Sequence, residues 1–358
     1  MFDYTGAIHM HSSFSDGTAK PDEIAGYANE VGLDYILLTD HNTLQAKTLG
    51  YEKKYGNTLL IAGYEINDME NKNHYLTFGL DKLVGNYKDI GGGEFGNTLP
   101  ASEYVKLVNE NGGFGFIAHP FEKRNSFPQH PPYPWTEWKI DNYNGIEIWN
   151  HMSEWIEGLT ENNQVNRFLH PLKSIVAPDI NAVKKWDTVN KHRKLPAIGC
   201  IDAHAHKISL IGFYNVEVFP YKVLFKSVRT NVILDEELDK NNFAKSSQMI
   251  LNAIKNGKSY IVNSYYGEAK GFRFFARKNG EYYSMGDDIN SNNTSQILLE
   301  CFLPKQARVR LMKNGECIDE STSTGGIWNC EGYGNYRIEC WINDKAWIFS
   351  NNIRILKN

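Results

Sequence analysis

Short apolar runs alternate with amphipathic segments over the first two thirds of the chain. Residues 20–31 carry apolar side chains at helical spacing, with Pro21 suited to the first turn and Gly32 suited to end the helix. A second helix is predicted over 102–111. Residues 35–39, 59–64 and 115–118 are apolar almost throughout, which is typical of buried parallel strands. The alternation predicts an α/β fold.

The predicted strands share one chemical feature: most of them end in side chains that bind metals. Residues 35–39 lead into Asp40 and His41, 59–64 into Glu65, 115–118 into His119, and 198–201 into Asp202 and His204, while 74–80 begins with His74. In a (β/α) barrel the carboxyl ends of the strands meet at one face, where active-site groups collect. The recurrence therefore predicts a barrel with a multinuclear metal site.

Residues 9–17, HMHSSFSDG, carry the densest candidate chemistry. If 7–11 form a strand, His9 and His11 leave the same face because side chains alternate along a strand. The turn-forming residues that follow can bring the carboxylate of Asp16 back over them. Two imidazoles and a carboxylate suit a divalent metal ion. An isolated His-x-His is otherwise an accident of composition, so the argument depends on the downstream strand ends.

Five segments in fixed order, HMHSSFSDG, LLTDHN, AGYEI, IAHP and DAH, resemble the PHP (polymerase and histidinol phosphatase) superfamily of metal-dependent hydrolases. Within it, the chain is most similar to two-domain phosphoesterases with an extra C-terminal β domain. The resemblance covers roughly residues 5–265. It implies a distorted seven-stranded (β/α) barrel of PHP type, with two or three divalent metal ions at its C-terminal face.

The resemblance also implies a division of the ligands among the ions. His9, His11, Glu65 and Asp202 would surround one metal, and Glu65 would be shared with a second metal held by His74 and His119. Asp16, His41 and His204 would form a third site or its remnant. Imidazole and carboxylate ligands without thiolate favour Zn, Mn or Fe. Metal-activated water would make a protein nucleophile unnecessary.

Three charged residues beside the predicted ligands are further candidates. Asp40 is expected to orient His41 or to donate a proton to the leaving group, although a strand-end cap explains it as well. Lys123 and Arg124 follow His119 closely and are predicted to hold a substrate phosphate, with solvated loop charges as the alternative.

Three other segments carry expectations of their own. Glu147 is expected to face the barrel interior and to support the site from there. The glycine-rich residues 91–96 are expected to form a loop that acts as a lid, and 259–262 the closing strand of the barrel.

After residue 264 the pattern changes to short strands divided by turn signals. Strands are predicted over 272–276, 296–302, 308–312, 336–342 and 346–348, with Asn-Gly turns at 279–280 and 314–315. This spacing predicts a small β-sandwich. We therefore expect a PHP-like hydrolase domain over 1–265 and a structural β-sandwich domain over 266–358.

Composition limits the binding partners and the cellular location that we expect. The 358 residues carry a formal net charge of -4, which disfavours a nucleic-acid scaffold because no excess of positive charge is available for phosphates. The five cysteines have no C-x-x-C spacing and are expected to be free, mostly buried thiols. There is no apolar run of about 18 residues and no basic-apolar leader, so we expect a cytoplasmic protein without membrane contact. The sequence does not indicate an oligomeric state.

These observations predict a metal-dependent hydrolase, and the family resemblance favours a phosphoesterase acting on a small phosphorylated metabolite or nucleotide. The same metal clamp would serve a carbon-centred ester, amide or carbamate. A non-catalytic binding module with a retained metal site is the alternative from a different class.

Overall fold

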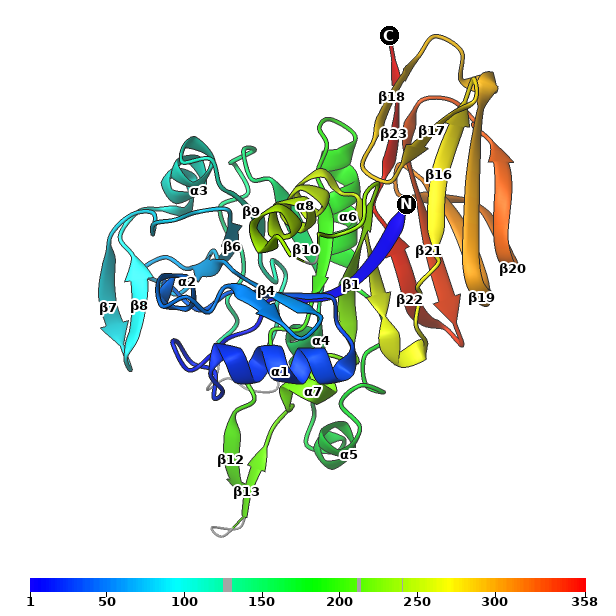
Figure 1. Ribbon diagram of the computed structural model, residues 1–358. Coiled ribbons are helices and arrows are strands. Elements are labelled where there is room, and N and C mark those ends of the chain that lie inside the picture. The colour runs from blue at the N-terminus through cyan, green and yellow to red at the C-terminus, as the bar shows by residue number, and fades with distance from the viewer. Residues whose placement is uncertain (125–130, 211–213, 240) are drawn as a thin grey trace.

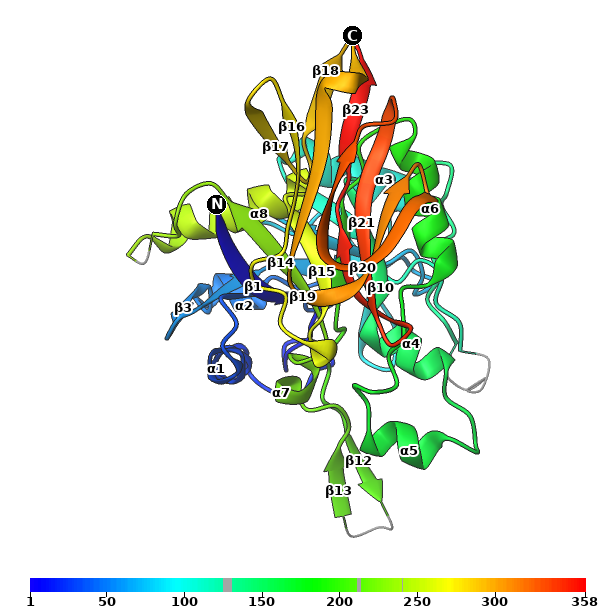
Figure 2. The same ribbon diagram turned by 90° about the vertical axis from the view of Figure 1, so that its right-hand side faces the viewer.

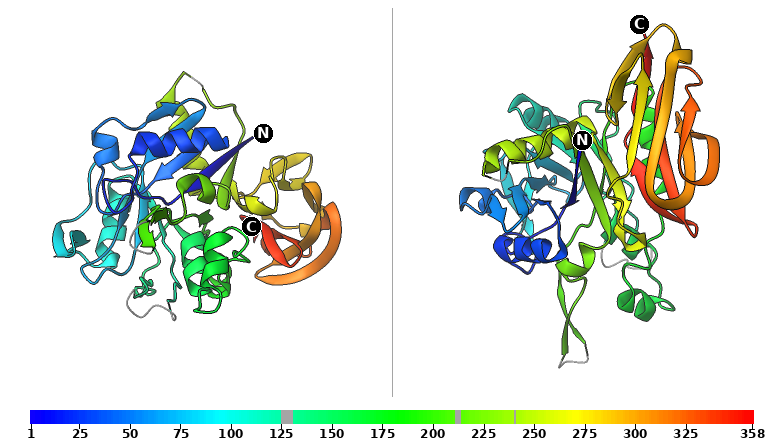
Figure 3. Two further views of the ribbon diagram at one scale, coloured as in Figure 1. Left: turned by 90° about the horizontal axis from the view of Figure 1, so that it is seen from below. Right: turned by 45° about the vertical axis from the view of Figure 1, so that its right-hand side comes forward.

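The computed structural model describes residues 1–124, 131–210, 214–239 and 241–358. The chain forms an α/β part followed by a large β-rich C-terminal region (Figure 1). The C-terminal strands rise beside the α/β part on one side (Figure 3).

Two groups of strands build the α/β part. In the first group, the strands β1 (Phe2–Ile8), β2 (Tyr35–Leu38) and β4 (Thr58–Ala62) are parallel neighbours in this order. Strand β3 (Lys53–Tyr55) is antiparallel to β4 on one side, and β14 (Val228–Leu234) is antiparallel to β1 on the other. In the second, the order is β5 (Tyr64–Ile66), β6 (Tyr75–Phe78), β9 (Phe114–Ile117), β10 (Gly145–Asn150) and β11 (Ala197–Cys200). Strand β6 is antiparallel to both of its neighbours, whereas β9, β10 and β11 are parallel.

The two groups touch at the two outer strands of the second group, β5 and β11. The predicted strand 59–64 breaks at Gly63, so that β4 lies in one group and β5 in the other. His41 and Glu65 form a parallel bridge at this edge, and Met10 and Ala203 form another between the ends of β1 and β11. The carboxyl ends of β1, β2 and β11 therefore meet.

Helices cover the outside of these strands. Helix α1 (Pro21–Val31) has Pro21 in its first turn and ends at Gly32, whose φ of 82° is left-handed, as predicted. Helix α3 (Ala101–Glu110) also confirms its prediction. The remaining helices are α2 (Gln45–Thr48), α4 (His151–Glu157), α5 (Gln164–Leu169), α6 (Ile180–Asn190), α7 (Tyr221–Leu224) and α8 (Phe243–Asn256), with short 3-10 turns over Ser264–Tyr266 and Thr294–Gln296.

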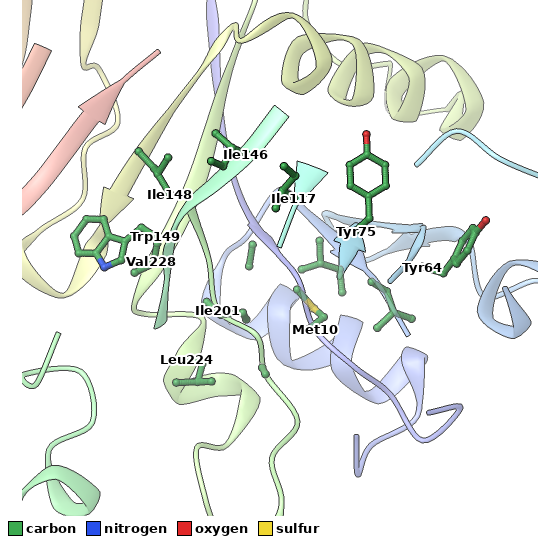
Figure 4. Close-up of a cluster of buried hydrophobic side chains, with 14 of the residues drawn as sticks. Met10, Tyr64, Tyr75, Ile117, Ile146, Ile148, Trp149, Ile201, Leu224 and Val228 are labelled. Carbon is green, nitrogen blue, oxygen red and sulfur yellow. The ribbon is translucent and has the colours of Figure 1, made fainter. Parts of the chain in front are cut away.

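One buried apolar cluster supports the ends of the strands. Met10, Ile117, Ile146 and Ile201 belong to it and are fully buried (Figure 4). Because these side chains sit directly beside the polar strand ends in the sequence, their packing fixes the backbone that carries the candidate ligands.

The C-terminal region consists of strands joined by tight turns. They are β16 (Arg273–Lys278), β17 (Glu281–Ser284), β18 (Asp288–Ser291), β19 (Ile297–Lys313), β20 (Glu316–Asn329), β21 (Gly334–Ile342), β22 (Lys345–Ser350) and β23 (Ile353–Lys357). Both predicted Asn-Gly hairpins are confirmed, since Asn279, Gly280, Asn314 and Gly315 all have positive φ. The strands predicted over 296–302 and 308–312 are two halves of the single strand β19.

Strand β15 (Ser259–Asn263) connects the two parts instead of closing a barrel. It is antiparallel to β14 on one side and to β22 on the other. The expectation of a closing strand was wrong, because β15 pairs with β14 and β22 and so extends the first strand group into the C-terminal region. One hydrogen-bonded sheet therefore runs through both parts of the chain.

Two further hairpins project from the α/β part. The prediction of a loop over 91–96 was wrong, because these residues complete a hairpin: residue 91 ends β7 (Tyr87–Gly91), 92–93 form the turn, and 94–96 belong to β8 (Glu94–Asn97). Strands β12 (Lys207–Leu210) and β13 (Tyr214–Glu217) form a ribbon that extends away from the body (Figures 1 and 2).

The cysteines are free thiols in the part of the chain that the structure describes. Cys317 is exposed and the other four are buried, which confirms the expectation. None of the helices within the described ranges combines the length and apolar character needed to cross a bilayer.

Candidate metal centre

The carboxylate of Glu65 lies at the middle of a group of histidines. Its Oε2 atom is 3.0 Å from Nε2 of His9 and 3.3 Å from Nε2 of His11. Its Oε1 atom is 2.8 Å from Nδ1 of His74 and 3.2 Å from Nε2 of His119. Nδ1 of His41 also lies 3.6 Å from Oε2. The two oxygens therefore face different imidazoles, and the side chains of Glu65, His9, His11, His74 and His119 are buried.

Asp202 completes the group around the first pair. Its Oδ1 atom is 3.3 Å from Nε2 of His9 and 3.5 Å from Nε2 of His11. Four ligand atoms, two nitrogens and two oxygens, thus converge on one point next to Oε2 of Glu65.

A second carboxylate, that of Asp16, organises the remaining predicted ligands. Its Oδ2 atom is 3.1 Å from Nε2 of His204 and 3.8 Å from Nε2 of His41, and its Oδ1 atom is 3.5 Å from Nδ1 of His11. The ring of His11 stacks between those of His41 and His204. The structure thus brings all nine residues predicted as ligands into one contiguous cluster.

Three of the nine residues have left-handed backbone. The φ angles are 66° at His9, 25° at His119 and 53° at Asp202. This region is unfavourable for residues other than glycine, and such strain persists where the surrounding structure enforces it, often at functional sites. The expectation of a continuous strand over 7–11 was wrong: β1 ends at Ile8, and the turn at His9 directs both histidines toward Glu65.

Glu147 and Asn150, at the end of β10, hold three ligands from outside the cluster. Glu147 Oε1 lies 3.2 Å from Nδ1 of His9, and Oε2 accepts a hydrogen bond from the backbone N–H of His119. Asn150 Nδ2 donates to Glu147 and to Oδ2 of Asp202. Glu147 thus contacts two of the predicted ligands, as expected of a residue that supports the site. Sequence reasoning missed Asn150, whose position after Glu147 on the same strand end was the only signal.

Cys200 was also missed as a neighbour of the cluster. Its Sγ atom lies within 4.8 Å of ligand atoms of His9 and Glu147, and the three side chains are buried. Because Nε2 of His9 faces Glu65, the Cys200 thiol lies on the side of the imidazole away from Glu65. Burial raises the pKa of this thiol well above its ordinary value. A neutral thiol there packs against His9.

Asp40 holds the loop that carries Asp16. It is 2% exposed, and its carboxylate accepts hydrogen bonds from the backbone N–H of Ser12 and from the hydroxyls of Ser12 and Ser15. The loop is also compact at Gly17, where a Cβ atom would lie 2.0 Å from the carbonyl oxygen of His11. The structure thus places Asp40 under the loop of residues 12–17.

The two cations predicted to contact substrate are in different surroundings. The Arg124 guanidinium donates to Glu122 and lies 4.6 Å from the ring centroid of Tyr133, which itself stacks on His74. The ammonium of Lys123 lies instead 3.6 Å from Glu157 and 3.9 Å from Asp179. Arg124 therefore borders the ligands, whereas Lys123 lies among carboxylates to one side.

Burial and nearby carboxylates shift the pKa values of the ligand histidines in opposite directions. Burial alone would lower the pKa of His11, but Asp16, Asp202 and Glu65 raise it to about 10. His119 behaves in the same way, with burial opposed chiefly by Glu65, and its pKa rises to about 9. Burial lowers the pKa of His41 to about 3. The carboxylates create a strongly negative potential that favours cations in the cluster.

The residues present fit divalent cations. Several buried imidazole nitrogens have no hydrogen-bond partner among the described residues: both nitrogens of His11, Nδ1 of His41 and Nδ1 of His119. Buried polar atoms are seldom left unpaired, so the nitrogens of His11 and His41, which face the carboxylates of Asp16 and Glu65, indicate a bound ion. The donors are imidazole nitrogens and carboxylate oxygens, in groups compact enough to hold an ion.

Comparison with known proteins places the chain in a family. The family model of the PHP domain matches residues 7–261, which contain every residue of the cluster. The chain belongs to the PHP domain family. This confirms the resemblance seen in the sequence, and PHP proteins are metal-dependent hydrolases that include phosphoesterases.

Individual relatives of this PHP protein are distant. The uncharacterized protein MJ1587 of Methanocaldococcus jannaschii is 26% identical over an alignment of 129 positions, which covers 32% of this chain and 66% of that protein, just under two thirds of its length. A two-domain protein of Bacteroides vulgatus ATCC 8482 that contains a predicted PHP-like metal-dependent phosphoesterase has 16% identity and a TM-score of 0.44 over 98% of this chain and 95% of that one. Endonuclease Q bound to a 27-mer duplex has 15% identity and a TM-score of 0.39 over 71% of this chain and 57% of its own.

Proposed function

We propose that this PHP protein is a phosphoesterase that acts on a small phosphorylated metabolite or nucleotide by means of two or three divalent cations. The observation that carries the proposal is the geometry of Glu65, whose two oxygens face different sets of imidazoles. A carboxylate that bridges two cations places them close enough to act on one substrate group.

The family resemblance and these distances support the same ligand sets for the first two cations. His9, His11, Glu65 and Asp202 would hold one cation, and Glu65, His74 and His119 the other. Asp16, His41 and His204 would hold a third. When bound, such cations lower the pKa of a coordinated water and stabilise charge that develops on the substrate oxygens. Zn, Mn and Fe all suit these donors.

The other residues of the chain position the ligands and the substrate. Glu147 would keep His9 in the tautomer that leaves Nε2 free to bind a metal. Asp40 would keep Asp16 in place through Ser12 and Ser15, which accounts for its burial better than a proton-donor role. Arg124, held by Glu122 and Tyr133, would bind the substrate phosphate.

The fold proposal accompanies the site. We infer a distorted barrel of seven strands, β1, β2, β4 with β5, β6, β9, β10 and β11, because the two strand groups touch at His41–Glu65 and at Met10–Ala203. The division into 1–265 and 266–358 is proposed as a division of roles, with the C-terminal region structural.

Elemental analysis of the purified chain, combined with a screen of phosphomonoesters and phosphodiesters in added Mn or Zn, tests the function. We expect two or three metal equivalents and phosphate release, both lost in His9→Ala and Glu65→Ala, while His192→Ala, an exposed histidine outside the cluster, keeps both. Bound metal with hydrolysis of carbon esters, amides or carbamates alone would replace the phosphoesterase assignment. No metal after reconstitution would contradict it entirely.

A further inference from the structure

A cavity of about 120 Å³ adjoins the metal centre between the end of β10 and helices α4 and α6. His119, Glu147 and Asn150 line one end, where their side chains are almost fully buried. Glu157 and Asp179 line the other end, where 36% and 25% of their side chains are exposed. The cavity therefore leads from the proposed metal site toward solvent.

Its inner end presents a donor without a partner. His119 is 6% exposed and lines the cavity, and its Nδ1 atom has no hydrogen-bond partner among the described residues. Because Nε2 of this ring faces Glu65, Nδ1 carries the proton when His119 binds a metal. The inner end would then accommodate an oxygen acceptor of a bound molecule.

The outer end presents two carboxylates whose contacts with Lys123 are long. Asp179 caps α6 through Oδ1, which accepts from the N–H groups of Asn181 and Ala182, whereas Oδ2 faces Lys123. Glu157 faces the same ammonium at 3.6 Å. These distances exceed those of a tight ion pair, so Lys123 is a loosely held cation at this end.

The wall between the two ends is largely apolar. Phe121, Ile148, Trp149, Ala177 and Ala182 contribute to it. The carboxylates of Glu122 and Glu154 also line the cavity, and they already accept hydrogen bonds, among others from Ser153 Oγ and Trp149 Nε1 respectively. A cavity of about 120 Å³ is somewhat smaller than an apolar cavity of about 150 Å³ that accepts benzene, so it suits a group of about four or five non-hydrogen atoms. A chain of three methylenes and one terminal nitrogen has this size.

We propose that the cavity binds the part of the substrate that does not react, and that it selects a short alkyl chain ending in an ammonium or guanidinium group. The inference rests on the proposed function for the position of the reacting phosphate. The substrate cation would displace Lys123 from between Glu157 and Asp179. This assigns Lys123 the task of occupying the cation site in the absence of substrate, in place of the phosphate contact predicted from the sequence.

Calorimetric titration of the metal-loaded protein with two phosphonates tests the inference. The probes, 3-aminopropylphosphonate and butylphosphonate, cannot be hydrolysed as esters and differ only at the terminal group. We expect the amine to bind at least about tenfold tighter. The preference should disappear in the double variant Glu157→Gln with Asp179→Asn, in which asparagine retains the helix cap. Glu236→Gln is the control, because this exposed glutamate pairs with Lys245 at a similar distance of 3.7 Å.

The possible outcomes separate the two proposals. Equal affinities of the wild-type protein for both phosphonates would overturn the cation subsite and leave the metal clamp supported. If neither phosphonate binds, the phosphoesterase proposal fails, and propylammonium alone is then titrated by NMR. Binding of propylammonium that depends on Glu157 and Asp179 would still support the subsite, and its absence would overturn it.

Discussion

Oε1 of Glu147 lies 3.2 Å from Nδ1 of His9. The other ring nitrogen of the same histidine faces Glu65 and Asp202, so the imidazole is held between a supporting carboxylate and the proposed metal. Because Glu147 also accepts the backbone N–H of His119, one side chain connects ligands of both proposed cations. Supporting groups of this kind orient metal ligands and increase their basicity.

Glu147→Gln should weaken both cation sites together. We expect a loss of about 10- to 100-fold in metal affinity, the range found when partners of metal ligands are replaced. Competition with a metal chelator, followed by elemental analysis, measures it. Glu300→Gln is the matched control, since Glu300 is also a buried strand glutamate but pairs with Arg277 in the C-terminal region. Unchanged affinity in Glu147→Gln would show that the contact is only packing.

Asp40→Asn should destabilise the loop that carries Asp16. One amide oxygen cannot accept the three hydrogen bonds that Ser12 and Ser15 donate to the carboxylate, and a buried donor left unpaired costs about 1–3 kcal/mol. Urea unfolding measures this loss, and elemental analysis should show that the third equivalent of metal is lost first. In a double-mutant cycle with Ser12→Ala, additive losses would contradict the proposed network.

His151 should make the fold sensitive to acid. Its imidazole is fully buried beside Ser227, and burial lowers its pKa to about 3. The folded state therefore keeps His151 neutral, whereas the unfolded chain takes up a proton near pH 6.5, and stability is lost as the pH falls below that value. Between pH 7 and pH 5 this histidine should cost about 2 kcal/mol of unfolding free energy.

Urea unfolding of chelator-treated protein at the two pH values checks this expectation. His151→Gln should lose about 2 kcal/mol less than the wild-type protein on acidification. The exposed His170→Gln should behave like the wild-type protein. An equal acid sensitivity in all three proteins would mean that His151 titrates normally in the folded state.

Truncation after residue 265 should prevent cooperative folding. Residues 260–262 of β15 pair with residues 350–348 of β22. The backbone N–H of Ala346 also donates a hydrogen bond to the carbonyl of Val176. The ring of Phe349 contacts that of Trp149 at the end of β10. Removing these contacts would expose a strand edge and apolar surface, which promotes aggregation. Size-exclusion chromatography and urea unfolding of residues 1–265 measure the effect, and a monomer that unfolds cooperatively would establish two separable domains.

Elements with strong local signals were predictable from the sequence. Helix α1 depends on Pro21, its apolar spacing and Gly32, and the hairpins at Asn279–Gly280 and Asn314–Gly315 depend on residues that tolerate positive φ. Three glycines at 91–93 were a weaker signal, because they suit a long loop and a tight hairpin turn equally well. The β7–β8 pairing there depends on residues on both sides of the turn.

The identities of the candidate ligands also came from local patterns, because His, Asp and Glu follow apolar strands whose ends must meet in an α/β fold. Their geometry depended on tertiary contacts. The left-handed backbone at His9 is stabilised by packing of Met10 and by pairing with the segment after β11, and the partners of Glu147, Asp40 and Lys123 lie far away in the sequence. Strand β15 likewise acquires its neighbour β22 from a segment that begins about eighty residues later. Local sequence restricts backbone angles and burial within a few residues, whereas the pairing of distant segments is decided by the packing of the whole chain.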